Sequence, residues 1–572
     1  MDILNNNLHI LSAHPTLLLT TLLIPLLYLL TRQLLLPKPI PQIPYDPAAA
    51  SQILGDVPSL ESDPSGLALW AGHHLARLKT PLCQVFMGPL AKPMVLVADI
   101  GNARDIMFFR SDFDRSDYIL NRFPLFKGFH FRMKTGEQWK LSRGWVKDLM
   151  GKEFLGSVGK DVVYGSVRRL VGLWEVQARL AGTERAFSMT HDLRALALDV
   201  ISGFYLGGEF EDWGLQRQLD LVGKLGAESV KAGQHGEVIF PKAEVHRFTE
   251  GMILVGDRLA AIYDAVNTKL PPGLVSFWFR YVNPSFGHFF RAKDRFLGRI
   301  LDLSMTRLGE EKKPSSGVDY MVAREDKAAQ RAGRKPLVGG LRQTMIDEVY
   351  GNLIAGQHTT SAALVWILKF VTENPDVQEN LKAEVAAVVG GEERFPTGEE
   401  LAAARLPYHD AVIEETMRLR ASFLMPRDAV RATELLGYRI PKGTICVLVS
   451  QGHQLESTGD MKKREYPGAE RANPNLEVFD PERWLVRNEA TGEITFDGSS
   501  YPQMAFGLGP RGCWGRKLAQ MEMRMMLALV VWRFELLPVL PDALSNHDAG
   551  YDISYRAKNG YLRLRIKDEL KG

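Results

Sequence analysis

The segment FGLGPRGCWG, residues Phe506–Gly515, decides the fold, and it opens a long apolar, methionine-rich stretch that we predict as the final helix, about Trp514 to Glu535. A cysteine at a helix N-terminus, such as Cys513, meets unpaired backbone N–H groups and the positive end of the helix dipole. Both favour the thiolate, which is the form that ligates metals. The glycines before it allow a tight turn and a close approach of the backbone to a flat ligand, and Arg511 can meet a carboxylate or a propionate.

The isolation of this cysteine limits the kind of metal that it can bind. One thiolate without a Cys or His partner nearby does not suit structural zinc, which takes four protein ligands. It suits a metal whose other ligands come from a macrocycle. The remaining cysteines, Cys83 and Cys446, are interpreted as small core hydrophobes. Three cysteines cannot form a disulfide framework, which favours a reducing compartment.

The same segment also contains a misleading pattern. Gly507-x-Gly509-x-x-Gly512 fits the dinucleotide-binding fingerprint G-x-G-x-x-G. That fingerprint requires a buried strand before it and an acidic residue at a strand end about 20 residues further on. Here the preceding residues, SSYPQMA, are not a buried strand, and the acid at that distance, Glu535, ends a helical run. We therefore reject a Rossmann interpretation.

Composition bounds the fold class. The 572 residues are 45% hydrophobic and 24% charged with a net charge of +3, which excludes a disordered chain, a collagen-like repeat and a many-span transporter. The small charge excess gives no argument for a nucleic-acid partner. Apolar periodicity predicts a long core helix from Leu341 to about Val371. We interpret Gly309–Lys335 as a solvated connection and Leu435–Val449 as paired strands around a turn. Helix clearly outweighs strand, so we predict one large, mainly α domain with small β-sheets, of the α+β class.

An apolar segment near the N-terminus predicts a membrane anchor. Thr16–Leu36 is just long enough to span a bilayer if Arg32 snorkels to the headgroups, and Pro25 kinks such a helix without forbidding it. A cleaved signal peptide would need positive charge before the apolar run and a small-residue cleavage site after it, and neither is present. Arg32 and Lys38 follow the span and place the body in the cytosol. The predicted organisation is an anchor at 1–36, a proline-rich hinge at 37–47 and one domain at 48–572.

Two further motifs carry little information singly. Glu415 and Arg418 stand at i and i+3, so they share a helix face and can pair, and a buried pair would need further partners such as Arg483. Trp139 and Arg143 stand at i and i+4, where an indole N–H and a guanidinium face the same way. Each pattern is common on ordinary surface helices. Their order along the chain, ahead of the Cys513 loop, is what gives them weight.

Taken together, the motifs resemble those of the cytochrome P450 family. Residues Phe506–Gly515 fit its haem-loop pattern F-x-x-G-x-R-x-C-x-G at every fixed position. The resemblance implies a P450-like fold and haem b with Cys513 as its axial thiolate, and Cys513 as the only protein ligand of the metal. It extends from Trp139 to Gly515 in the family's order. The residues that it assigns to the haem are Cys513, Trp139, Arg143, Arg427, Phe506, Gly507, Arg511 and Gly515.

The resemblance also implies roles for the other charged motifs. Glu415-Thr416-Met417-Arg418 resembles the family's E-x-x-R motif, and Arg483 in FDPERW resembles the third member of that network. Their implied role is structural, because they hold the core behind the haem. Trp139, Arg143 and Arg427 resemble the groups that bind the haem propionates.

The oxygen-binding segment is where this chain departs from the family. Ala355–Thr360, AGQHTT, resembles a pattern of a small residue, Gly, any residue, an acid, Thr and Thr or Ser. Gly356 would loosen the helix, and the hydroxyl of Thr359 would bond back to the carbonyl of residue i−4 and hold the hydrogen-bond network beside bound oxygen. The acid position is occupied by His358. Its imidazole can relay protons, pack in the core or contact substrate.

The resemblance implies a monooxygenase that inserts one oxygen atom of O2 into an apolar substrate, by hydroxylation or epoxidation. Electrons would come from NADPH through a flavoprotein reductase, and the enzyme would be a single-pass protein of the endoplasmic reticulum membrane that contacts lipid through its N-terminal helix. The sequence as a whole resembles those of fungal enzymes of secondary metabolism. Two alternatives stay open: a haem-thiolate isomerase, dehydratase or peroxide-driven enzyme, and a non-catalytic haem-binding membrane protein. Around Cys513, four cations predict either a basic docking face or a solvated helix end: Arg511, Arg516, Lys517 and Arg524.

Overall fold

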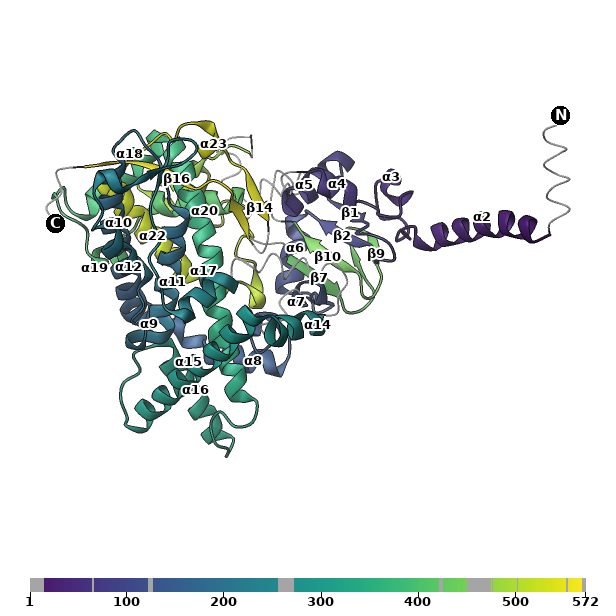
Figure 1. The fold of residues 1–572 in the computed structure, drawn as a ribbon, viewed down its shortest axis with the longest axis horizontal. Coiled ribbons are helices and arrows are strands. Elements are labelled where there is room, and N and C mark those ends of the chain that lie inside the picture. The colour runs from purple at the N-terminus through teal and green to yellow at the C-terminus, as the bar shows by residue number, and fades with distance from the viewer. Residues whose placement is uncertain are drawn as a thin grey trace.

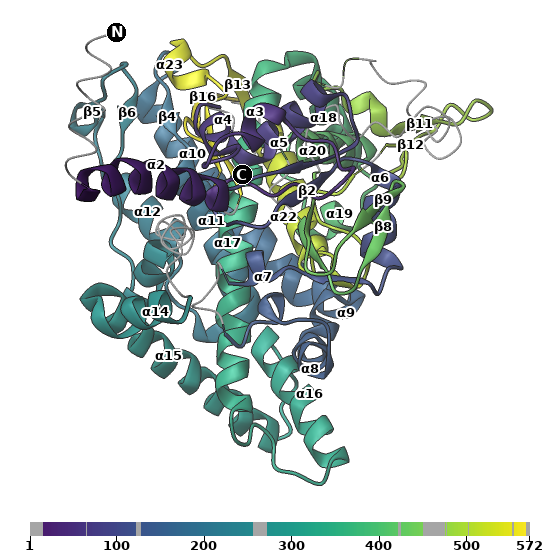
Figure 2. The ribbon, with the colours of Figure 1, turned by 90° about the vertical axis from the view of Figure 1, so that its right-hand side faces the viewer.

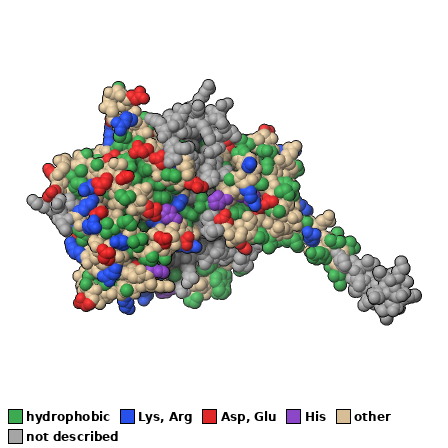
Figure 3. Space-filling view, turned by 90° about the horizontal axis from the view of Figure 1, so that it is seen from above, with side chains coloured by type: hydrophobic (Ala, Val, Ile, Leu, Met, Phe, Trp, Pro, Cys, Tyr) green, Lys and Arg blue, Asp and Glu red, His purple; other side chains and the backbone are tan. Residues whose placement is uncertain are grey.

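A computed structural model describes residues 15–63, 66–121, 127–255, 272–420, 425–449, 475, 477–501, 503–551 and 554–567. Figure 1 shows a helical body, a smaller lobe built around a sheet, and the N-terminal helix α2 projecting beyond that lobe. The expected mainly α architecture with small β-sheets is confirmed by the order of the elements. In the space-filling view, basic and acidic side chains are interspersed over the face that is shown (Figure 3).

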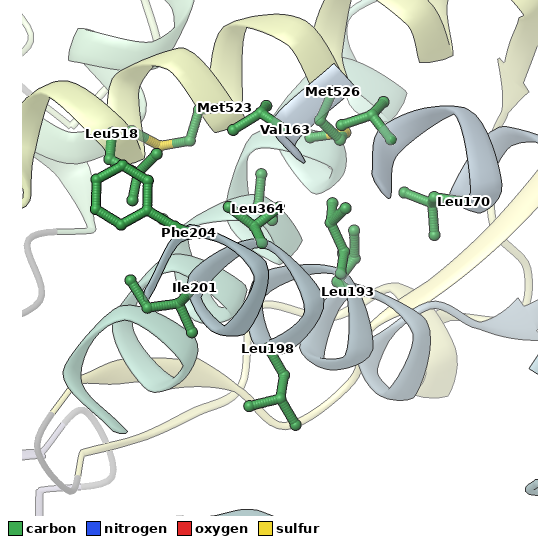
Figure 4. Packing of buried hydrophobic residues seen from close by; sticks show 14 of the residues in the cluster. Val163, Leu170, Leu193, Leu198, Ile201, Phe204, Leu364, Leu518, Met523 and Met526 are labelled. Carbon is green, nitrogen blue, oxygen red and sulfur yellow. The ribbon is translucent and has the colours of Figure 1, made fainter. Parts of the chain in front are cut away.

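Helix α17, Leu341–Glu373, forms the centre of the body. It matches the long core helix predicted from Leu341 to about Val371, and Figure 2 shows it running through the molecule. Helices α11 (Thr190–Leu206) and α22 (Arg516–Arg533) pack against it, and α10 (Lys160–Ala181) packs on those two helices. Apolar residues fill the space between these four helices, because each helix buries the face that it turns to the others. Figure 4 labels ten of them: Val163, Leu170, Leu193, Leu198, Ile201, Phe204, Leu364, Leu518, Met523 and Met526.

The lobe is built on a five-stranded sheet of order β1-β2-β10-β7-β3. Only β10 and β2 run parallel, and the other neighbours are antiparallel. The strands are β1 (Leu82–Val85), β2 (Met94–Val97), β10 (Ile445–Leu448), β7 (Met425–Ala429) and β3 (Phe113–Arg115). The sheet matters for the site because β3 and β7 carry two arginines to one place, with Arg115 directly opposite Arg427 in the register.

A second five-stranded sheet lies against the helical body and has the order β13-β16-β4-β6-β5. Its longest strand, β16, pairs antiparallel with β13, which follows α22 without a break. The expected final helix therefore ends two residues before the predicted boundary at Glu535. The strands are β13 (Phe534–Leu537), β16 (Tyr561–Ile566), β4 (Phe187–Ser188), β6 (Val238–Ile239) and β5 (Lys231–Ala232).

Two local expectations were wrong. The predicted solvated connection Gly309–Lys335 contains helix α16, Gly317–Arg331, in which Val318, Met321 and Val322 are buried. These few apolar residues hold helical spacing, and the many charges around them hid that pattern. In Leu435–Val449 the two strands do not pair with each other. Strand β9 (Tyr438–Ile440) pairs with β8 (Thr433–Leu435), whereas β10 joins the main sheet.

The N-terminal segment forms helix α2, Pro15–Leu35, over nearly the whole predicted anchor. None of the described helices combines the length and the apolar character that crossing a bilayer requires. The expected membrane-spanning helix is therefore not confirmed. Pro25 and Arg32, which lie within α2, are residues that an apolar span disfavours.

The proline-rich segment after α2 lies against the main sheet. The side chain of Gln84 accepts from the amide of Ile40 at 2.7 Å and donates to the carbonyl of Ile43 at 2.8 Å. Ile43 is buried in the hydrophobic cluster of that sheet. Residues 40–44, within the predicted hinge 37–47, are thus attached to the lobe by hydrogen bonds and apolar packing.

Candidate active site

One cavity brings together residues that lie far apart in the chain. It is lined by strand β7, the helices α11 and α17, the loop before α22, and the segment that contains β3, η1 (His130–Arg132) and α8 (Glu137–Trp145). All the residues that the sequence assigned to a cofactor or to catalysis line it: Trp139, Arg143, His358, Thr359, Arg427, Phe506, Gly507, Arg511, Cys513 and Gly515.

The loop that carries Cys513 is held tightly by its own backbone. The amide of Cys513 donates to the carbonyl of Phe506 at 2.7 Å. Gly507 and Gly509 have φ angles of +62° and +67°, a region that side chains disfavour. A Cβ at Gly509 would stand 2.2 Å from the carbonyl oxygen of Met107, so only glycine allows the loop to pack on the lobe. The loop therefore presents the Cys513 thiol at a fixed place.

The sequence predicts that the helix end favours the thiolate of Cys513, whereas burial in the structure acts against it. Helix α22 begins at Arg516 rather than at Trp514, and the thiol opens onto the cavity ahead of it. Desolvation by the surrounding protein raises the pKa of Cys513, while the amide of Gly515 and the charge of Arg143 act to lower it. The N-terminal donors are present as expected, but burial outweighs them. A bound metal cation would reverse this balance, because it stabilises the thiolate directly.

Four arginines line the cavity: Arg115, Arg143, Arg427 and Arg511. Burial lowers the pKa of both Arg427 and Arg511 to about 10, which reports how unfavourable these charges are without an anion. Like charges directly opposite each other on paired strands, such as Arg115 and Arg427, are also destabilising.

Several donors of this arginine cluster are unused. Among the residues that the structure describes, the buried Nε of Arg115, Nη1 of Arg143, and Nε and Nη1 of Arg511 have no hydrogen-bond partner. Unpaired buried cations are costly, so such a cluster indicates an anionic ligand. The two propionates of a haem supply two negative charges in one flat molecule, and the arginines therefore fit that group.

The sequence did not identify Arg115, because no motif surrounds it. Its place depends on the pairing of its strand with that of Arg427, which lies 312 residues further along the chain.

Trp139 was predicted to act beside Arg143. Its ring instead lies under the guanidinium of Arg511, 4.6 Å from the ring centre. Glu522 was also missed. Burial among apolar neighbours raises its pKa to about 8, and it too lines the cavity.

We predict that Arg115→Met separates haem binding from folding. It removes one charge-assisted bond to a propionate, which is worth about 1.5–3 kcal/mol, or about 10- to 100-fold in haem affinity. It removes a like-charge repulsion and also the bonds from Arg115 to the carbonyls of Phe131 and Arg511, at 3.1 Å each, so the heat stability of the haem-free protein should change little. Haem per polypeptide is measured by the pyridine haemochrome assay. Arg110→Met serves as the control, because Arg110 pairs with Asp112 outside the cavity. Equal haem retention in both variants would contradict the role of Arg115.

The helix α17 presents a short polar opening to the cavity. Ala355, Gly356 and Thr359 are at least partly exposed there, on a helix that is otherwise buried from Met345 to Thr372. The hydroxyl of Thr359 donates to the carbonyl of Ala355 at 2.9 Å, which confirms the expected bond to residue i−4. Gly356 does not interrupt the helix. A Cβ there would stand 2.8 Å from Cγ1 of Ile201, so this glycine allows α11 to pack closely on α17.

His358 lies beside this opening and is 3% exposed. It lines the cavity, and its backbone carbonyl accepts from the hydroxyl of Ser361 at 3.2 Å. Its position is compatible with each of the roles that the sequence left open.

The three-member charge network is assembled away from the cavity. Glu415 of α20 (Pro407–Leu419) accepts from Arg418 Nε at 2.7 Å and from Arg483 Nε at 3.1 Å. The indole of Trp484 and the amide of Asp480 also donate to Glu415, at 3.1 and 3.0 Å. Both carboxylate oxygens are thus fully used in a site that excludes water. Such an arrangement holds α20 to the η9 turn, Pro481–Trp484, and fits a structural role.

A cavity with one accessible cysteine, buried arginines that lack anions and a threonine-bearing helix defines a haem-thiolate enzyme. Comparison with known proteins agrees. The cytochrome P450 family model matches residues 257–563. The chain is 52% identical to the cytochrome P450 monooxygenase xilC of Penicillium crustosum, over 96% of both chains. It is 30% identical to the cytochrome P450 monooxygenase TRI13 of Fusarium sporotrichioides, over 96% of this chain and 98% of that one.

This chain belongs to the cytochrome P450 family and is a monooxygenase of that family. Its fold agrees with the crystal structure of a cytochrome P450 (CYP102L1), with a TM-score of 0.66 and 18% identity over 93% of this chain and 99% of that one. The family carries haem with a thiolate axial ligand. In this chain the residues that would hold it are Cys513 at the iron and Arg115, Arg143, Arg427 and Arg511 at the propionates. When bound, the haem supplies the activation of O2.

Proposed function

We propose that this enzyme hydroxylates or epoxidises an apolar organic substrate of secondary metabolism, with electrons delivered from NADPH by a flavoprotein reductase. The observation that carries the proposal is a single cavity that Cys513 and Thr359 both line and whose remaining walls are mostly apolar. Apolar walls bind an apolar molecule by removing its surface from water, and they exclude water from the reacting atoms. The apolar lining includes Ile119, Phe129, Phe131, Ile201, Ala363 and Met417.

The fungal relatives support the pathway class. One of them, from Dothistroma septosporum, is a cytochrome P450 monooxygenase named for the Hps1-dma1 cluster, and it is 34% identical over 49% of this chain. Away from the four arginines, the lining of the cavity is mostly apolar, and such a lining fits the carbon skeletons of these pathways.

The redox partner and the membrane belong to the same proposal. Attachment to the endoplasmic reticulum, with the catalytic domain facing the cytosol, is supported by the exposed leucines of α2, such as Leu27 at 65%. The cations around Cys513, which predicted either a basic docking face or a solvated helix end, are engaged by other groups of the protein. Arg516 pairs with Glu414 at 3.6 Å, Arg524 donates to Asp410 at 3.0 Å, and Lys517 donates to the carbonyl of Met150 at 3.2 Å.

The proposed function is tested by reconstituting the haem-loaded full-length protein with an NADPH-dependent reductase and a panel of apolar compounds. We expect oxygen consumption that requires both NADPH and the reductase, and a product that carries one atom of labelled O2. Mass spectrometry of the product measures the label. Product formed from hydrogen peroxide, with no response to NADPH and reductase, would contradict the proposal.

We further propose that His358 passes protons toward oxygen bound beside Thr359. Replacing it by phenylalanine keeps the volume but removes both ring nitrogens. His358→Phe should therefore lower the product formed per NADPH consumed by about tenfold or more, because a general acid or base contributes about 100- to 10,000-fold to a proton transfer. Haem content should not change. The control is Ser361→Ala, which removes the side-chain bond to the carbonyl of His358 and leaves the ring intact. Unchanged coupling in His358→Phe would favour the packing interpretation.

A further inference from the structure

Two polar side chains that were not assigned to the haem interrupt the apolar wall of the cavity. They are His130, in the η1 turn, and Asn352, on α17. Glu348, one turn before Asn352, holds both of them. Its Oε1 accepts from His130 Nδ1 at 2.5 Å and from Asn352 Nδ2 at 2.9 Å. Glu348 is fully buried and does not itself line the cavity, so it acts through the other two.

The segment that carries His130 is fixed to α17 before any ligand binds. The backbone amide of His130 donates to Glu348 Oε2 at 2.8 Å, and that of Gly128 donates to Asp347 Oδ2 at 3.0 Å. Gly351 makes the close approach possible, because a Cβ there would stand 2.3 Å from the ring of Phe129. A polar group held in this way loses little conformational entropy when it binds a ligand.

The bonds to Glu348 determine which atoms are left for a ligand. Asn352 Nδ2 donates to both the carbonyl and the carboxylate of Glu348, which fixes the orientation of the amide. The proton on His130 Nδ1 faces the carboxylate. Among the described residues, neither Oδ1 of Asn352 nor Nε2 of His130 has a partner. Polar atoms without partners on a cavity wall raise the free energy of the protein, unless a ligand supplies hydrogen-bond partners for them.

The place of Asn352 along α17 relates the pair to Thr359. Asn352 and Thr359 are seven residues apart, which is close to two full turns, so both face the cavity and lie about 10 Å apart along the axis. We propose that His130 and Asn352 bind a hydroxyl group of the substrate and thereby place a carbon about two helical turns away beside Thr359. This inference rests on the proposed function and names the substrate class, an apolar alcohol or phenol.

Other polar groups fit less well. A carbonyl or an ether only accepts hydrogen bonds, and so leaves Oδ1 of Asn352 without a donor. A carboxylate would be repelled by Glu348 behind the pair. An amine cation could donate to the same two acceptors, but the four arginines that line this cavity would repel it. A hydroxyl can share its one proton between the two acceptors, Oδ1 of Asn352 and Nε2 of His130, in a three-centre hydrogen bond.

The test uses three rigid probes of equal length: 4-hydroxybiphenyl, 4-methoxybiphenyl and biphenyl. Their dissociation constants for the haem-loaded full-length enzyme are measured by the shift of the Soret band and, independently of that band, by isothermal titration calorimetry. We expect the wild type to bind 4-hydroxybiphenyl at least about tenfold more tightly than either of the others. Asn352→Leu and His130→Phe should each lose that preference while still binding biphenyl.

The matched control is Ile119→Ala, which trims the apolar wall and should weaken all three probes alike. Equal affinity of the wild type for the three probes would overturn the proposal, as would a hydroxyl preference that survives in both polar variants. Failure of the proposed function would be seen separately, as turnover of the wild type that does not respond to NADPH and the reductase.

Discussion

Replacing Cys513 by alanine is expected to abolish the strongly red-shifted Soret band that the ferrous–CO complex of a thiolate-ligated haem shows. Cys513 is the only cysteine among the described residues that lines the cavity, so no other thiol can take its place at the iron. Electron donation by the thiolate is what favours O–O cleavage in this family, and monooxygenase activity should therefore be lost with the band. The ferrous–CO difference spectrum of the purified variant is the measurement.

The other two cysteines provide matched controls for this experiment. Cys83 and Cys446 are buried in the main sheet, where burial raises the pKa of Cys446 to about 12. Neither Cys83→Ala nor Cys446→Ala should change the position of the band. Haem itself should remain partly bound in Cys513→Ala, because the arginine cluster is unchanged. A red-shifted band in that variant would show that another group ligates the iron.

The features that could be predicted from the sequence are those that depend on residues close together in the chain. The Cys513 loop and the pairing of Glu415 with Arg418 follow from local spacing, as does the core helix around Thr359. The Rossmann alternative was rejected for the same reason, since the residues before Gly507 are not a strand. Such patterns are set by backbone geometry, which changes little with the surrounding fold.

The features that could not be predicted depend on contacts between distant segments. Arg115 joins the arginine cluster only because β3 pairs with β7, and His130 meets Glu348 across 218 residues of sequence. For Cys513 the sequence named the helix-end groups that lower the pKa of the thiol, but not the desolvation that raises it. Local sequence patterns predict which groups act on a side chain, and the fold determines how much each group shifts its pKa.

Replacing Glu415 by alanine should have the largest effect on folding, although Glu415 does not line the cavity. The change leaves the guanidinium groups of Arg418 and Arg483 in a buried site without the carboxylate that they share, and the indole of Trp484 also loses its acceptor. Breaking a buried ion pair from one side costs about 3–5 kcal/mol, because it leaves uncompensated charge. Urea unfolding followed by circular dichroism gives the change in free energy of unfolding.

The double variant Glu415→Leu/Arg418→Met keeps this prediction testable if the single variant does not fold. Removing both charges of the closest pair should recover part of the loss, and Arg483 retains its bond to the carbonyl of Asn475 at 3.0 Å. An exposed pair of similar length, Glu535 with Arg565 at 2.7 Å, sets the scale for a surface ion pair. Glu535→Ala should cost less than about 1 kcal/mol. If Glu415→Ala cost no more than Glu535→Ala, the network would be dispensable for folding, and its burial would have to serve another purpose.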